Sequence, residues 1–376
     1  MESKMLWYPS QQMDPKIWSR MPEDLLERVL SFLPLKTFLS LRSTCRHFNS
    51  LVFSPPFISK YSPSSSPSSS GFSSFFLLSH PQFSRKYPLF DTVHNNWRNL
   101  SVSLSAAQPP CGSSSALLSS SNGLLCFSHP TSNSFVISNL LSRSSRLVKF
   151  PALPFSFDSI TLVSMPSGNY KILVIKSSMG SSKTTFVYDS SFHSWEKSED
   201  FDLIFSNYIH HQEGVPHQGS LYFITPEPFH VLCFDFQTGK WRRAAIDLPA
   251  DLSFARLVSD GDGKLFLIGG IGRNGISRSM KVWEWNEDEE RWMDVEDVPE
   301  MMCKKFLSVC YHNYEHVYCF WHQGLVCVCC YTWPEILYFK VSRKTWHWLP
   351  KCPSLPLKWS CGFKWFSFVP DLYSFV

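Results

Sequence analysis

Residues 231–241 read VLCFDFQTGKW, and this stretch decides the fold. It opens with a short run of apolar and β-branched side chains, which favours a β-strand. Thr238 and Gly239 then supply a tight turn, and Trp241 follows two residues later. We therefore interpret the stretch as one hairpin of a β-sheet.

The same hairpin pattern recurs along the C-terminal part of the chain. An apolar run and a short polar turn precede each of four tryptophans, which are Trp195, Trp241, Trp292 and Trp346. They are separated by 46, 51 and 54 residues. A period of about 50 residues is typical of kelch-type β-propellers, in which each repeat is one four-stranded blade. We expect the tryptophans to fill the wedges between blades, because a sheet with two apolar faces packs on both sides.

The repeats predict a mainly β chain with a kelch-like propeller of about six blades, and five or seven blades stay open. The first repeat is degenerate, since residues 135–137 lead to Arg146 without a tryptophan. Apolar and polar side chains alternate over residues 363–369 as in a β-strand, and we interpret these residues as the final strand. We expect it to pair with strands near the N-terminus and close the ring. Residues 75–78 are a candidate for such a strand.

The composition agrees with an all-β body. Hydrophobic residues make up 44% of the 376 residues, aromatic residues 16% and charged residues 18%. Aromatic side chains fit pleated surfaces well. The net charge is only +4, and basic pairs are scattered rather than clustered. We therefore expect no nucleic-acid partner, because such a surface concentrates positive charge.

No apolar run approaches the roughly 18 residues that a membrane-spanning helix needs. Residues 1–10 also lack the apolar core of a signal peptide. We therefore expect no membrane association and a location in the cytoplasm and/or the nucleus. The 12 cysteines are then expected to be reduced.

A helix is predicted over residues 22–33. Pro22 suits a first helical turn, and two acidic residues follow it at the positive end of the helix dipole. Apolar residues then repeat at helical spacing, namely Leu25, Leu26, Val29, Leu30 and Leu33. Pro34 is expected to end the helix.

Two further short helices are predicted, one capped near Thr37 and one running from Cys45 to Val52, where residues 54–56 stop it. Three helices in about 35 residues cannot bury this much apolar surface on their own. The module therefore needs a partner.

Residues 21–48 resemble an F-box. The resemblance rests on a Pro-bounded apolar helix, on a Leu33-Pro34 pair after it, and on a closing segment in which Cys45 precedes a basic residue and an aromatic one. The sequence departs from the family pattern at Met21, Thr37, Thr44 and Phe48. Together with the repeats, the chain resembles a plant-type F-box/kelch-repeat protein.

This resemblance implies a substrate-recognition adaptor of a Skp–cullin–F-box ubiquitin ligase. The F-box would bind a Skp-family adaptor, and through it a cullin, while the propeller would bind an unknown target protein for ubiquitination and degradation. The implied adaptor-binding residues are Pro22, Leu25, Leu26, Val29, Leu30, Leu33, Pro34, Leu41 and Cys45. Such a subunit performs no catalysis and needs no cofactor.

The predicted organisation has four parts. Residues 1–14 form a tail, residues 15–57 the helical module, residues 58–75 a Ser/Pro-rich linker, and residues 76–376 the propeller, with core repeats over 119–376. The linker is of low complexity and cannot build a core.

Three motifs suggest chemistry, and each has a plainer interpretation. Residues 270–275 spell GxGxxG, but a strand pattern rather than a helix follows them, so a blade turn is favoured over a dinucleotide site. Residues 327–330 read CVCC within an apolar run, which favours a buried strand over a zinc site. His210 and His211 match no ligand motif, so no metal site is predicted.

Two alternatives stay open. The chain could be a propeller enzyme or a metal-binding protein whose helical module is merely structural, with Tyr208, His210 and His211 as imaginable ligands. It could also be a scaffold that joins the adaptor without a degradation target.

Overall fold

The computed structural model describes residues 20–33, 35–60, 74–83, 86–101, 115–177, 183–198, 212–261, 263–355, 358–372, 374 and 376. The chain divides into two compact units, Met1–Phe72 and Ser73–Val376. The first is helical in its described part, and the second is built of strands.

The described part of the first unit holds four helices: α2 (Glu23–Ser31), α3 (Leu35–Leu41), α4 (Arg46–Leu51) and α5 (Pro55–Lys60). The sequence had predicted three. Pro55 opens a fourth helix rather than only ending the third, because proline is well tolerated in a first helical turn. The helical part thus runs past residue 57, the predicted end of the module.

Local chemistry sets the helix starts. Pro22 is the N-cap of α2, and Glu23 and Asp24 occupy its first turn, where the helix dipole favours negative charge. At α4 the backbone N–H of Phe48 donates to Cys45 Sγ at 3.4 Å, so the cysteine caps this helix.

The first unit has a small apolar core. Its fully buried hydrophobic side chains are Leu30, Phe38, Leu51, Val52, Phe57 and Ile58. The rings of Phe38 and Phe57 lie 5.0 Å apart, and α5 contacts α2. The added helix α5 therefore supplies much of the core on which α2 rests.

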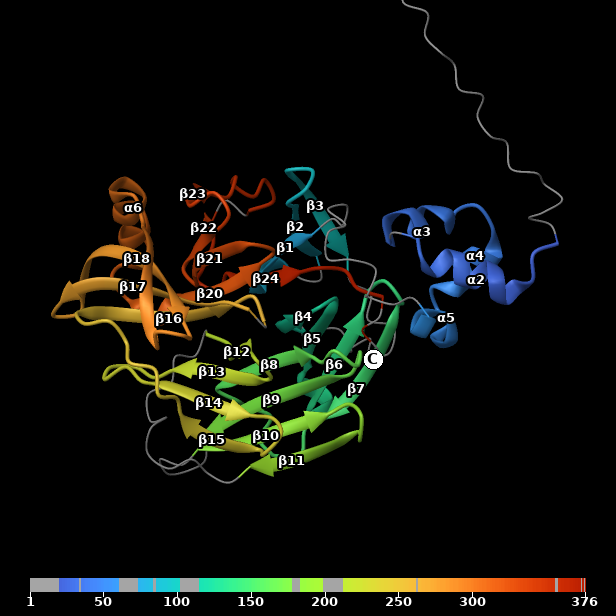
Figure 1. Cartoon of the computed structure of the whole chain (residues 1–376), viewed down its shortest axis with the longest axis horizontal. Coiled ribbons are helices and arrows are strands. Elements are labelled where there is room, and N and C mark those ends of the chain that lie inside the picture. Colours follow the sequence, from blue (N-terminus) through green and yellow to red (C-terminus); the bar gives the residue numbers. More distant parts are fainter. Residues whose placement is uncertain are drawn as a thin grey trace, which may run out of the picture. The chain divides into compact units, whose positions relative to one another are not determined.

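The second unit consists of six four-stranded antiparallel sheets (Figure 1). This confirms a propeller of six blades. Blade 1 contains β4 (Leu117–Ser121), β5 (Leu124–His129), β6 (Ser134–Asn139) and β7 (Ser144–Lys149). Blade 2 contains β8 (Ser159–Ser164), β9 (Tyr170–Ser177), β10 (Lys183–Asp189) and β11 (Ser194–Ser198). Blade 3 contains β12 (Val215–His217), β13 (Ser220–Ile224), β14 (Val231–Asp235) and β15 (Lys240–Arg243).

The remaining three blades follow the same order. Blade 4 contains β16 (Leu252–Ser259), β17 (Leu265–Arg273), β18 (Ile276–Asn286) and β19 (Arg291–Asp297). Blade 5 contains β20 (Val317–His322), β21 (Leu325–Cys330), β22 (Trp333–Lys340) and β23 (Thr345–Trp348). Blade 6 contains β24 (Lys364–Phe368), β1 (Phe75–Ser79), β2 (Lys86–Asp91) and β3 (Asn96–Ser101).

Blade 6 closes the ring by joining the two ends of the unit. β24 pairs antiparallel with β1, with Phe366 opposite Leu77. The predicted pairing of the last strand with an N-terminal strand is therefore confirmed. Because the strands come from opposite ends of the unit, closure depends on contacts of very long sequence separation.

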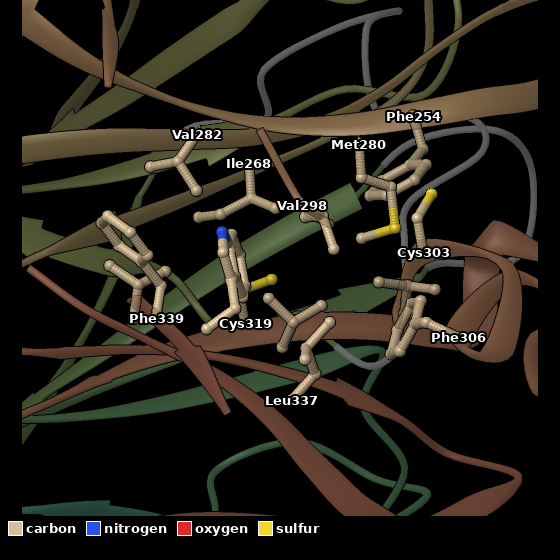
Figure 2. Packing of buried hydrophobic residues seen from close by; sticks show 14 of the residues in the cluster. Phe254, Ile268, Met280, Val282, Val298, Cys303, Phe306, Cys319, Leu337 and Phe339 are labelled. Atoms are coloured by element: carbon tan, nitrogen blue, oxygen red, sulfur yellow. The ribbon is translucent and has the colours of Figure 1, made fainter. Parts of the chain in front are cut away.

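Six hydrophobic clusters hold the blades together, one at each seam between neighbours. Figure 2 shows the seam of blades 4 and 5, where Ile268 and Val282 of blade 4 meet Leu337 and Phe339 of blade 5. The helix α6 (Glu300–Cys310) joins these two blades and buries Phe306 in the same cluster. Burial of this apolar surface supplies the main driving force for ring formation.

The two faces of the propeller differ. Connections between the first and second, or third and fourth, strand of a blade lie on one face, which we call the turn face. It includes two-residue turns such as Asn122-Gly123, in which both residues have positive φ. The other connections, including α6, lie on the opposite face, which we call the loop face.

Candidate functional site

The predicted adaptor-binding residues differ in exposure. Leu25 is 50% and Val29 42% exposed. Pro22 and Cys45 are also exposed, whereas three of the leucines are half-buried, namely Leu26, Leu33 and Leu41. Pro34 lies outside the described residues. An apolar surface is thus present on α2, mainly at its exposed valine and leucine.

Leu30 departs from the predicted set. Only 4% of this residue is exposed, so it belongs to the core of the first unit and does not offer a surface to a partner. The reason is geometric: the apolar residues of α2 cover more than one face of the helix, and Leu30 falls on the face toward the unit's interior.

Two exposed aromatic residues of the first unit were missed. Phe32, the C-cap of α2, is 69% exposed, and Phe53 is 39% exposed with the Arg42 guanidinium 5.7 Å from its ring centre. Each stands just after the end of a helix, but no sequence pattern distinguished these two aromatic residues from the buried ones. They extend the exposed apolar surface of this unit.

The tryptophans singled out in the sequence occupy one structural position. Each is the second residue of the outermost strand and lies opposite an aromatic residue of the third strand. Ring centroids are 5.1–5.3 Å apart in the pairs Tyr188–Trp195, Phe234–Trp241, Trp285–Trp292 and Phe339–Trp346. Blade 6 adds a fifth pair, Phe90–Trp97, at 5.2 Å.

Each aromatic pair faces the preceding blade. Trp241 Nε1 donates to Thr185 Oγ1 of blade 2 at 3.0 Å, and Trp195 Nε1 donates to the Lys149 carbonyl of blade 1 at 2.8 Å. The indole therefore adds a directional bond to apolar packing at these two seams.

A central cavity of about 730 Å³ is lined by the first strand of every blade. Polar side chains cross each seam around it. Ser119 Oγ of β4 accepts a hydrogen bond from the Leu162 N–H of β8. Thr161 Oγ1 of β8 accepts one from the Gly214 N–H, just before β12. The His217 ring of β12 contacts the Ser259 hydroxyl of β16. Hydrogen bonds also cross the remaining three seams. Arg256 donates to the Val317 carbonyl, the His322 ring bonds to the Ser367 hydroxyl, and the Ser120 hydroxyl donates to the Ser367 carbonyl.

This polar ring was missed by sequence reasoning, which expected apolar strands only. Its physical reason is that an innermost strand leaves one edge without a neighbouring strand, and buried backbone groups need partners. Serine and threonine within otherwise apolar first strands were the available signal.

An ion pair crosses the cavity near the loop face. Glu213, which precedes β12, lies 3.0 Å from Lys364 Nζ of β24 and accepts a 2.5 Å hydrogen bond from Ser119 of β4. The neighbouring Gln212 accepts from the Cys319 N–H of β20 at 3.0 Å. Two consecutive side chains thus tie blade 3 to blades 5, 6 and 1.

The cysteine run lies in β21, as predicted for a buried strand. Burial raises the pKa of the Cys327 and Cys329 thiols well above the usual value. The thiolate form that binds metal is therefore disfavoured. Among the described residues no group of His, Cys, Asp and Glu could hold a metal ion. Tyr208, His210 and His211 lie outside those residues.

The GxGxxG stretch forms the tip of the β17–β18 hairpin, with a strand on each side, which confirms a blade turn. A side chain at Gly272 would collide with the Ile276 carbonyl, since an added Cβ would lie 1.8 Å from it. Gly270 and Gly272 thus serve close backbone approach, whereas Gly275 has a positive φ of +70° in the turn.

Comparison with known proteins agrees with this architecture. Residues 18–60 match the F-box domain, and residues 102–347 match the F-box associated beta propeller domain. An F-box/kelch-repeat protein of Arabidopsis thaliana is 52% identical over 97% of this chain and 90% of its own length. This chain belongs to the F-box/kelch-repeat family.

More distant relatives span the same two units. Protein UNUSUAL FLORAL ORGANS of Arabidopsis thaliana is 25% identical over 91% of this F-box/kelch-repeat chain and 81% of its own length. Among solved structures, a chain of a nidogen/laminin complex aligns with 79% of this chain and 99% of its own, with a TM-score of 0.48 and 9% identity. No helix in the described residues is long and apolar enough to span a membrane.

Proposed function

We propose that this F-box/kelch-repeat protein is the substrate-recognition subunit of a Skp–cullin–F-box ubiquitin ligase. The first unit binds a Skp-family adaptor and through it a cullin, and the propeller binds a target protein. The chain raises the effective concentration of the target near the ubiquitin-carrying enzyme and performs no bond chemistry itself. Its proposed location is the cytoplasm and/or the nucleus.

The exposed apolar surface of α2 supports the adaptor contact. Leu25 and Val29 are four residues apart, so they lie on one face of the helix, and about half of each is open to solvent. Phe32 and Phe53 add exposed aromatic area in the same unit. The exposed apolar pair on α2 supports a protein-binding role, because exposed apolar patches mark such sites.

A non-catalytic propeller is supported by the central cavity. Its buried polar side chains bond to neighbouring blades, as Thr161 and Gln212 do. Glu213 and Lys364 are paired with each other. The His217–Ser259 and His322–Ser367 contacts likewise join neighbouring blades, so these polar groups serve ring cohesion, and this structural use supports a non-catalytic role.

Co-purification with a plant Skp-family adaptor tests the proposal. Leu25→Glu and Val29→Glu place a charge on the exposed face of α2 without disturbing its core, and each is expected to abolish recovery of the adaptor. Leu153→Glu is the matched control, because Leu153 is a 74% exposed leucine of the propeller. Unchanged recovery with both α2 variants would contradict the proposal.

Turnover separates a ligase subunit from a mere scaffold. A protein that the full chain captures while the proteasome is blocked should have a shorter half-life with wild-type chain than with Val29→Glu. Equal half-lives would favour a scaffold that joins the adaptor without a degradation target.

A further inference from the structure

The hairpin of β17 and β18 stands out on the loop face of the propeller. Its strands contain 9 and 11 residues, whereas the corresponding strands of blade 3 contain 5 each. Residues 269–279 form its tip and carry two arginines, Arg273 and Arg278, and no acidic residue. The tip is therefore a basic projection.

The tip is braced from both sides. The Gly272 N–H donates to the Asp251 carbonyl at 3.0 Å, and the Ser277 N–H donates to Tyr314 Oη at 2.8 Å. Ser253 and Ser277 also share a hydroxyl hydrogen bond of 2.5 Å. An extended hairpin that is bonded on both flanks presents its exposed residues in a fixed geometry, which lowers the entropic cost of binding a partner.

A groove of about 740 Å³ lies between this tip and the loops of blade 3. One wall is formed by residues 272–275 of the tip, and the other by residues 227–230, 246–249 and 251–253. Apolar side chains such as Phe229 and Leu248 line it together with charged ones. Its volume falls within the range of ligand-binding pockets.

The charges of the groove are of both signs and are not paired with one another. Arg243 and Arg273 line it, as do Glu227, Asp247 and Asp251. Among the described residues, the ion pairs within 4.0 Å include none of these five side chains. The Arg243 guanidinium contacts His230 Nδ1 at 2.9 Å. A partner with complementary charges would therefore satisfy groups that the chain leaves in water.

The opposite face is less suited to a partner. Part of it is occupied by the C-terminal residues, since Asp371 and Ser374 carbonyls both accept from Asn139 Nδ2 at the end of β6. The strand β1 also enters the propeller from that face, because it pairs as the second strand of blade 6.

We propose that this groove binds an extended segment of the target protein, with an acidic side chain against Arg243 and Arg273 and a basic side chain against Asp247 and Asp251. The proposal rests on the proposed function, since it names where and by what chemistry the receptor holds its target. Charges at the rim of such a site govern specificity and the rate of association.

A peptide-display selection tests the groove. A library of random 12-residue peptides is selected for binding to the full chain in complex with its adaptor. Enriched peptides are expected to contain acidic residues and to bind Arg273→Glu about tenfold more weakly than wild type. Arg273→Gln, a milder change at the same exposed position, should weaken binding in the same direction. Arg343→Glu is the control, because Arg343 is an exposed arginine in a turn of the turn face.

The outcomes are distinct from those for adaptor binding, which is measured on the same proteins. The proposal is supported if Arg273→Glu loses peptide binding but still recovers the adaptor, while Arg343→Glu binds the peptides as wild type does. Enrichment of purely basic peptides, no enrichment at all, or equal loss in the Arg343→Glu control overturns it. Absence of the adaptor complex itself would instead overturn the proposed function.

Discussion

Ser138 lies opposite Ser145 in blade 1, at the position where the other five blades place a tryptophan against an aromatic residue. This position faces the seam with blade 6, which is the seam that closes the ring. The closing seam therefore lacks an aromatic pair at this position, and the rings that meet across it are those of Tyr87 in blade 6 and Phe127 in blade 1, 6.1 Å apart. The C-terminal residues fold over blade 1 instead, where Leu372 and Ser374 are buried.

Asn139→Ala is expected to loosen this closure. Asn139 is fully buried, and its Nδ2 donates to the Asp371 and Ser374 carbonyls at 2.8 and 2.9 Å. Removing the amide takes this donor away from both carbonyls, at a cost of about 1–3 kcal/mol. Denaturant unfolding measures the loss, and Asn99→Ala, at an exposed position of β3, should cost under ~0.5 kcal/mol. Equal midpoints for the two variants would contradict this role.

Gly123→Ala should be costlier than an ordinary glycine substitution. Gly123 has φ +79°, and an added Cβ would lie 2.6 Å from the Asp371 backbone nitrogen. Gly239 also has a positive φ, +65°, but open space around it, so Gly239→Ala carries only the conformational cost of about 1 kcal/mol. We expect Gly123→Ala to lose at least ~1 kcal/mol more in thermal or chemical unfolding. The idea fails if the two alanine variants unfold alike.

Trp241→Ala should destabilise the seam of blades 2 and 3. Its side chain is buried in that cluster, and truncating a buried tryptophan costs about 3–5 kcal/mol. Trp241→Phe keeps much of the packing but loses the bond to Thr185, so a smaller loss of about 1–2 kcal/mol is expected. Trp359→Ala, at a 39% exposed ring, serves as the control in denaturant unfolding. A larger loss in the control would argue against the seam role.

The stability of the propeller should fall in mild acid because of His322. Burial lowers the pKa of this histidine from 6.5 to about 3, and its ring is enclosed between Phe76 and Ser367. The unfolded chain takes up the proton below pH 6.5, whereas the folded chain does so only near pH 3. The free energy of unfolding therefore falls between these limits, by up to ~1.4 kcal/mol per pH unit.

His322→Gln removes that titration and provides the comparison. The difference in unfolding free energy between wild type and His322→Gln should shrink from pH 7 to pH 5. A difference that does not change with pH would show that His322 is not a buried neutral group.

The fold was predictable because its signals are local and repeated. Trp195 and Trp241 follow a turn that an Asp side chain closes, since Asp189 Oδ1 accepts from the Ser191 N–H and Asp235 Oδ1 from the Gln237 N–H. Such Asx turns have a sequence signature, so the repeat length follows from the sequence. The blade number was predicted only as about six, and the structure fixes it at six. The final strand was likewise predicted from the alternation of apolar and polar side chains over residues 363–369.

The candidate site was less predictable because it depends on tertiary contacts. Helical spacing places Leu25, Val29 and Leu30 among the apolar residues of α2, but the packing of the unit decides that Leu30 is covered. The groove combines Arg243 and Arg273 from two blades, and no local pattern relates residues that the ring brings together. Sequence alone therefore gives the kind of module but not its exposed residues.

The central claim is that α2 binds a Skp-family adaptor, and a titration measures it most directly. Purified full-length chain is titrated with the adaptor in a calorimeter, alongside Val29→Glu and the Leu153→Glu control. We predict a one-to-one complex for wild type and Leu153→Glu, and at least a hundredfold weaker binding for Val29→Glu. No heat of binding with wild type, or equal affinity for Val29→Glu, would contradict the account.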